Sequence, residues 1–209
     1  MSSPGKRTTE LETKDLLLEV AIDLFATKGY AATSIRDIAN GMGMSISNIY
    51  HYYGNKEGIL LAIFEQSAVR LYEDLERVAE LDMDPAERLG LLVKTNLTHT
   101  GRFRNEARIY TIEREQYPPE AQERVKRLQR QILDMYVGQL RAIAAQGLLV
   151  HGDITVLAFN ILGVVNWPLR WFREDGPLAF DQVVEEIAGF VLRACLRPEA
   201  VPESYSAII

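Results

Sequence analysis

Polar side chains able to bind another molecule gather in one short stretch of the chain. They are Ser47, Asn48, Tyr50, His51 and Tyr52, which fall within two turns of a predicted helix. Each carries a hydrogen-bonding group on a short or rigid side chain, and such groups suit base edges, phosphate oxygens and thymine methyl groups in a DNA major groove. An ordinary solvated helix face is the alternative, but the tyrosines of residues 50–53 point in different directions. At least one ring is therefore expected on the surface without a folding reason, and a binding surface explains it.

A first helix leading into this stretch is predicted from the residues before it. Thr33 or Ser34 can cap about two turns of helix, because a hydroxyl there accepts from the first free backbone N–H groups. Asn40 and Gly41 can close that helix. Gly43 can supply the tight turn that lets a second helix cross the first, so the pattern predicts a helix-turn-helix.

The second helix is expected to begin with Ser45 as its cap. Its inward positions are then Ile46, Ile49 and Tyr53, which leaves the polar side chains facing out. Lys56 begins the next helix, where its ammonium group can hold a phosphate.

The segment from Leu16 to Leu61 resembles the N-terminal DNA-binding domain of the TetR family of bacterial transcriptional regulators. Three motifs carry the resemblance at the spacing of that family: AIDLFATKGY, TSIRDIA, and GMS followed by a helix ending IYHYYGNKEGIL. The resemblance implies phosphate contacts by Thr33 and Ser34, groove-facing positions for Ser45, Ser47, Asn48 and His51, and further phosphate contacts by Tyr50, Tyr52 and Lys56.

Positive charge is scarce around the predicted helix-turn-helix. Within residues 28–56, Lys28, Arg36 and Lys56 stand against one acidic residue, Asp37, which leaves an excess of two positive charges. One copy would neutralise few phosphates and would bind weakly. We therefore expect a homodimer that places two recognition helices on half-sites of double-stranded DNA, roughly 34 Å apart or a little more.

Composition sets the broad class of the protein. The chain has 209 residues, 47% of them hydrophobic, and a net charge of −6. That length can bury a core of one or two domains, and the acidic balance disfavours a general nucleic-acid or membrane-surface binder. The single cysteine, Cys195, excludes an internal disulfide and is expected to pack in the core. With no leader at Met1 and no apolar run near about 18 residues, we expect a cytoplasmic protein without a membrane partner.

Hydrophobic periodicity predicts an all-α fold of about nine helices, with no strand pattern and no internal repeat. Residues 8–56 are expected to form the helix-turn-helix DNA-binding domain, and residues 57–200 a helical effector-binding and dimerisation domain. The helices expected beyond the first domain are 56–81, one that starts at Pro85 and is interrupted by Gly101, about 105–116, 119–146, about 153–172 and about 177–196.

The last two helices are expected to form the dimer interface. The helix from Asp153 is apolar almost all round, so it needs cover on several sides, and a two-fold mate could complete a four-helix bundle with both. Gly163 and Gly189 would allow close approach of helices, or are tolerated without such a role. Pro168 should kink the first of the two helices.

Residues 166–178 combine aromatic rings with arginines. On one interpretation the rings fill the dimer core and the arginines cap helix ends or pair with Glu174 and Asp175. On the other, the segment resembles TetR-type regulators of lipid and steroid catabolism, whose effector is an acyl-CoA thioester. This resemblance implies a small hydrophobic effector, with a long-chain acyl-CoA as the candidate, near Trp167, Arg170 and Arg173. It also implies pocket positions, on helices that border the family's cavity, for Phe103, Arg104, Arg108, Tyr110 and Tyr117.

No catalytic or metal site is predicted. The histidines His51, His99 and His151 form no set with the scattered carboxylates. HExxH, paired zinc ligands, a Gly-rich phosphate loop and a G-x-S-x-G elbow do not occur. We therefore predict a non-enzyme without a cofactor: a ligand-responsive regulator, with repression as the favoured sense, whose effector moves the 56–81 helix and releases a palindromic operator. A helical adaptor that binds only protein is the alternative, and it leaves the outward-facing polar side chains unexplained.

Overall fold

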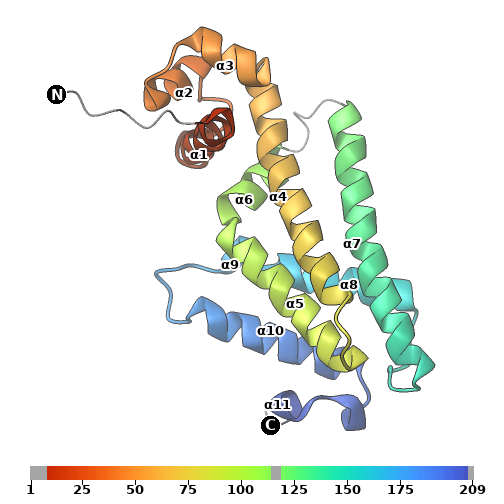
Figure 1. Ribbon diagram of the computed structural model, residues 1–209. Coiled ribbons are helices and arrows are strands. Elements are labelled where there is room, and N and C mark those ends of the chain that lie inside the picture. Colours follow the sequence, from red (N-terminus) through yellow and green to blue (C-terminus); the bar gives the residue numbers. More distant parts are fainter. Residues whose placement is uncertain (1–8, 114–118, 207–209) are drawn as a thin grey trace, which may run out of the picture. The chain divides into compact units, whose positions relative to one another are not determined.

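The computed structural model describes residues 9–113 and 119–206, and Figure 1 shows their helices. The side chains of residues 108 and 110–121 lie outside the described set. Every regular element among the described residues is helical, apart from one isolated antiparallel bridge between Leu149 and Leu196. The predicted all-α class is confirmed.

The helices run as follows along the chain: α1 (Glu10–Lys28), α2 (Ile35–Met42), α3 (Ile46–Tyr53), α4 (Lys56–Ala79), α5 (Pro85–Arg102), α6 (Arg104–Glu113), α7 (Pro119–Ala145), α8 (Ile154–Asn166), α9 (Pro168–Trp171), α10 (Phe180–Cys195), the short 3-10 helix η2 (Pro198–Ala200) and α11 (Glu203–Ser206). The chain divides into two compact units. The first comprises Met1–Ser67 and Asn105–Gln122, and the second comprises Ala68–Arg104 and Glu123–Ile209.

Side-chain caps fix where the helices of the first unit begin. At α1, the Thr9 hydroxyl accepts from the backbone N–H of Glu12 and the Glu12 carboxylate accepts from the backbone N–H of Thr9. Ser34 and Asp37 make the same reciprocal pair at α2. The apolar faces that these helices turn toward one another are fully buried and include Leu17, Leu18, Ala21, Phe25, Ile38, Ala39 and Ile49.

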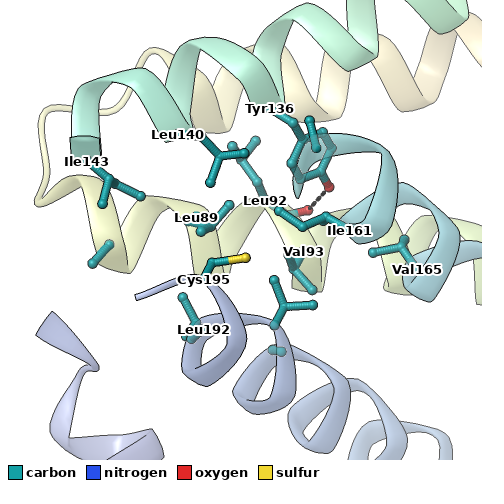
Figure 2. Packing of buried hydrophobic residues seen from close by; sticks show 14 of the residues in the cluster. Leu89, Leu92, Val93, Tyr136, Leu140, Ile143, Ile161, Val165, Leu192 and Cys195 are labelled. Carbon is teal, nitrogen blue, oxygen red and sulfur yellow. Dashed lines mark hydrogen bonds between the residues drawn. The ribbon is translucent and has the colours of Figure 1, made fainter. Parts of the chain in front are cut away.

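The second unit is built around α5, which packs against α8 and α10 (Figure 2). Its largest buried side chain, Tyr136 of α7, accepts a hydrogen bond from the Asn96 amide at 3.2 Å and donates one to the Leu92 carbonyl at 3.2 Å. Cys195 lies in the same core, as predicted, and its burial raises the pKa of the thiol to about 11. Tyr136 and Cys195 therefore both pack in a core that excludes water.

Two glycines have roles that differ from the prediction. Gly101 does not interrupt α5, which continues to Arg102. A Cβ at Gly101 would lie 2.3 Å from the Phe180 ring, so glycine is the residue that lets this ring approach α5. Gly41 does not close α2 either, because α2 ends at Met42 and left-handed Gly43 caps it, while a Cβ at Gly41 would lie 2.8 Å from Val20.

The stretch Ile154–Trp171 corrects a second prediction. It is long and apolar enough, by length and composition, to cross a membrane, whereas no such run was expected. The stretch contains Asn160 and Arg170, which is why a search for uninterrupted apolar residues passes over it. Pro168 divides it into α8 and α9, in agreement with the expected kink, and only 22% of it is buried within the described chain.

Candidate DNA interface and ligand pocket

The turn between α2 and α3 has the geometry of a helix-turn-helix. Gly43 caps α2 in the left-handed conformation at φ 62°, and its backbone N–H donates to the carbonyl oxygens at the end of the helix. The Ser45 hydroxyl then caps α3 by accepting from the backbone N–H of Asn48 at 3.3 Å. The buried side chain of Ile49 packs α3 against the rest of the first unit. The predicted turn and second cap are confirmed.

One face of α3 is open to solvent and is polar. Tyr50 is 51% exposed although its ring is large and mostly apolar. Tyr52 is half-buried, and its ring lies 5.5 Å from that of His51. Of the residues expected to contact DNA, those exposed on or next to α3 are Ser45, Ser47, Asn48, Tyr50 and His51. The structure therefore brings these five side chains to one accessible helix.

Thr33 is placed differently from the prediction. Its side chain is only 1% exposed, and its hydroxyl donates to the Gly29 carbonyl at 2.9 Å and lies 3.3 Å from the Leu24 carbonyl. A phosphate cannot reach a hydroxyl that is buried and bonded in this way. Ser34 is the cap of α2 and stays exposed, but its hydroxyl already donates to the Asp37 carboxylate at 2.6 Å. Those hydrogen bonds, together with Lys28, hold the pKa of Asp37 far below its usual value.

Lys56 is also engaged inside the first unit. Its ammonium group donates to the carbonyl oxygens of Tyr30 at 2.8 Å and Thr33 at 2.9 Å, and it lies 4.2 Å from the centre of the Tyr30 ring. An ammonium has three N–H donors, so at most one is left for a phosphate. Arg36, which sequence reasoning did not single out, is exposed on α2. The sequence could have pointed to Arg36 because this residue falls in the first turn of α2, the helix that precedes the tight turn at Gly43.

A cavity of about 390 Å³ lies in the second unit among α5, α8, α9 and the start of α10. Its lining residues are Leu97, Thr98, Thr100, Gly101, Arg102, Arg104, Val165, Pro168, Leu169, Phe172, Glu174 and Phe180. The aromatic rings of Phe172 and Phe180 pack edge to face with centres 5.0 Å apart. The wall is mostly apolar, and a few polar groups interrupt it, which is the usual composition of a small-molecule site.

Among the predicted effector residues whose side chains the structure describes, Arg104 alone lines this cavity. Its guanidinium donates to the Phe172 carbonyl and lies 5.8 Å from the centre of the Phe172 ring. Phe103 packs instead on the ring of His99. Trp167, Arg170 and Arg173 are near the cavity in sequence but do not line it, and Arg173 is paired with Asp175 at 2.9 Å. The side chains of Arg108, Tyr110 and Tyr117 lie outside the described residues.

Most lining residues were not predicted, because they come from five helices, α5, α6, α8, α9 and α10, that are far apart in the sequence. The signal that could have found some of them is the spacing of Leu97, Thr100, Gly101 and Arg104, which recur at three- and four-residue steps along α5 and into α6. The described residues contain no group of three or more metal-binding side chains.

Two family models match the chain. That of the bacterial regulatory proteins of the tetR family matches residues 17–63. That of the tetracyclin repressor-like C-terminal domain matches residues 82–195, which is more than half of the chain. The protein therefore belongs to the TetR family of bacterial transcriptional regulators, and the resemblance noted for residues 16–61 is confirmed.

Several characterised proteins are similar over most of their length. The transcriptional repressor KstR2 of Rhodococcus jostii is 28% identical over 187 residues, which cover 87% of this chain and 90% of that protein. The TetR-family regulator PfmR of Thermus thermophilus superposes with a TM-score of 0.80 at 29% identity and covers 87% of this chain and 99% of its own. AibR, solved in complex with isovaleryl coenzyme A and operator DNA, superposes with a TM-score of 0.77 at 30% identity over 86% of this chain and 97% of its own.

Proposed function

We propose that the protein is a cytoplasmic, dimeric repressor that binds a palindromic operator and leaves it when a small hydrophobic effector occupies the cavity of the second unit. The observation that carries the proposal is the exposed polar face of α3, with Tyr50 at its centre, on a helix-turn-helix whose two caps and turn fix its direction. Under this proposal Ser45, Ser47, Asn48 and His51 face the groove and its base edges, while Tyr50 and Tyr52 contact the phosphate backbone. Residues 8–56 then serve DNA binding, and residues 57–200 bind the effector and form the dimer.

A homodimer is supported by an apolar stripe that the described chain leaves uncovered. Val156 and Phe159 are exposed along α8, Trp167 is exposed just after it, and Phe190 is exposed on α10. These two helices pack against each other in one copy. Gly163 faces solvent on α8 with no heavy atom within 4 Å of an added Cβ, so a second copy could approach closely there. A partner copy would cover the stripe and remove the free-energy cost of exposing these apolar side chains to water.

A charge placed in this stripe tests the dimer. We expect Phe159→Glu to be monomeric by sedimentation equilibrium and to lose operator affinity, because the ring is 58% exposed in one copy and would be buried in two. Leu81→Glu is the control, since Leu81 is also an exposed apolar residue of the second unit but lies outside α8 and α10. A Phe159→Glu protein that sediments as a dimer would exclude this interface.

The size of the cavity bears on the effector. An apolar protein cavity of about 150 Å³ holds one benzene molecule, so a cavity of about 390 Å³ holds on the order of fifteen non-hydrogen atoms. That is room for an acyl chain but not for coenzyme A as well. For an acyl-CoA effector, the acyl group would enter the apolar cavity, and the coenzyme would stay outside, near Trp167, Arg170 and Arg173. The isovaleryl-CoA complex of AibR supports an acyl-CoA as the class of effector.

The experiment that tests the function is selection of genomic DNA fragments by the purified protein, followed by sequencing. We expect enrichment of a palindromic site, lost when acyl-CoA thioesters of increasing chain length, from isovaleryl to palmitoyl, are added. A palindrome that no thioester displaces would retain the DNA-binding function and reject the effector class. Absence of any enriched site would reject the repressor and favour a helical adaptor that binds only protein.

A further inference from the structure

Helix α5 carries cavity-lining residues on one side and a buried histidine on another. Leu97 and Gly101 line the cavity. His99 lies two positions from each of them along the helix, so it points away from the cavity. Its side chain is only 4% exposed. Imidazole rings are rarely buried this fully unless the surroundings hold them in place.

The partner of His99 is a carboxylate on α4. The Nδ1 atom of His99 lies 3.1 Å from Oδ2 of Asp74, and because a carboxylate can only accept, Nδ1–H is the donor. The imidazole ring also packs on the ring of Phe103, with centres 4.5 Å apart, and the guanidinium of Arg70 lies 5.6 Å from the Phe103 ring. The end of α5 that borders the cavity is thus joined to α4 by a part-buried polar contact and an adjoining aromatic one.

Helix α4 is held at its first residue as well. Lys56 donates to two carbonyl oxygens of the segment that leads into α2, those of Tyr30 and Thr33. One continuous helix therefore has Lys56 bonded to the helix-turn-helix segment at its start and Asp74 bonded to α5 further along. A shift of α5 at the cavity would act on α4 through His99 and Asp74.

We infer that the His99–Asp74 hydrogen bond transmits effector binding from α5 to α4, and that His99 is a positioning residue for the DNA-binding response. The inference rests on the proposed function. His99 does not contact the effector in this scheme, and its loss uncouples the two sites while each keeps its own affinity. Coupling between two sites is reciprocal, so operator binding must in turn alter α5 through the same contact.

Hydrogen–deuterium exchange of the full-length dimer tests this reciprocity without an identified effector. Operator duplex from the selection above is added to the wild type, His99→Leu, His99→Asn and Lys94→Met. In the wild type we expect exchange of the α5 amides around residues 97–102 to change at least about threefold on operator binding. His99→Leu should abolish that change. His99→Asn should restore part of it, because the asparagine amide can donate to Asp74 from nearly the place of Nδ1.

Lys94→Met is the matched control. It removes another α5 ion pair, the 2.8 Å contact between Lys94 and Glu185 of α10, and leaves the contact with α4 intact. It should respond to operator as the wild type does, and circular dichroism must show every variant folded. If His99→Leu proves unfolded, Asp74→Ala replaces it, since Asp74 is about one-third exposed and its loss is milder.

The second measurement is the operator Kd with and without saturating isovaleryl-CoA. A coupled wild type should weaken its operator binding at least about fivefold, and His99→Leu should stay within about twofold of its own effector-free value. A wild type that binds operator without changing exchange in α5, or a His99→Leu protein that responds like the wild type, overturns the inference. A wild type that binds no operator overturns the proposed function instead.

Discussion

Replacement of Thr33 by valine separates a folding role from a DNA-binding role at this position. Valine keeps the shape of threonine and removes only the hydroxyl, which is buried and donates to the Gly29 carbonyl at 2.9 Å. Loss of this hydrogen bond, with the carbonyl left unsatisfied, should lower the free energy of unfolding by about 1–2 kcal/mol. For a chain of this length that corresponds to a fall in Tm of roughly 2–8 °C.

The assay pairs thermal unfolding with operator titration at several salt concentrations. Thr27→Val is the control, because the Thr27 hydroxyl donates to the Asp23 carbonyl at 2.7 Å but is exposed. Its stability should change by less than about 0.5 kcal/mol. For Thr33→Val we expect the lower Tm and an unchanged dependence of the operator Kd on salt. An unchanged Tm together with a salt slope reduced by about 1 per subunit would show that Thr33 contacts a phosphate and would refute the reasoning from burial.

Four further substitutions test the packing and the caps. Asp37→Asn should lower the free energy of unfolding most at pH 7 and progressively less below pH 3.8: hydrogen bonds depress the folded-state pKa of Asp37, so its contribution is fully present above the ordinary value of 3.8 and declines as pH falls from there through the folded-state pKa. Urea unfolding between pH 3 and 7 measures this, and a constant difference from the wild type would contradict it. Gly101→Ala should destabilise by about 1 kcal/mol, because overpacking against Phe180 outweighs the gain in helix propensity. Gly138→Ala is the control, because no heavy atom lies within 4 Å of the added Cβ, and it should stabilise the protein by up to about 1 kcal/mol. Equal effects of Gly101→Ala and Gly138→Ala in thermal unfolding would contradict the packing argument. Tyr136→Phe should lower the free energy of unfolding in urea by about 1–3 kcal/mol, because it leaves the buried Asn96 amide of α5 without its acceptor. An unchanged free energy would show that water or a shift of the helix replaces the hydrogen bond.

The local parts of the DNA interface could be predicted because their signals are local. Ser45 and Gly43 act on backbone groups within four residues of themselves, so a cap and a turn are visible in the sequence. Thr33 and Lys56 could not be assigned in this way. The Leu24 carbonyl lies nine residues from Thr33 and the Tyr30 carbonyl 26 residues from Lys56, and whether a polar side chain faces solvent or such a carbonyl depends on how the helices pack.

The cavity was harder to predict than the helices that form it. Periodicity identifies α5 as a core helix. It does not show that Gly101 packs against the ring of Phe180, because Phe180 lies on a different helix, far along the chain. Arg104 was predicted only through the family resemblance, which implied a pocket position for it, and it does line the cavity. The aromatic and arginine residues of 167–173 drew attention by composition, yet Phe172 is the one of them that lines the cavity, together with Pro168 and Leu169 of the same segment.

The engagement of the lysines around the helix-turn-helix has a consequence for how the protein finds its site in a cell. Lys28 is paired with Asp37 and Lys56 is bonded to two carbonyls, so Arg36 is the remaining mobile positive charge of residues 28–56. Binding to arbitrary DNA depends almost entirely on such charge. The bulk chromosome should therefore sequester few copies, and a small number of molecules per cell can keep a single operator occupied.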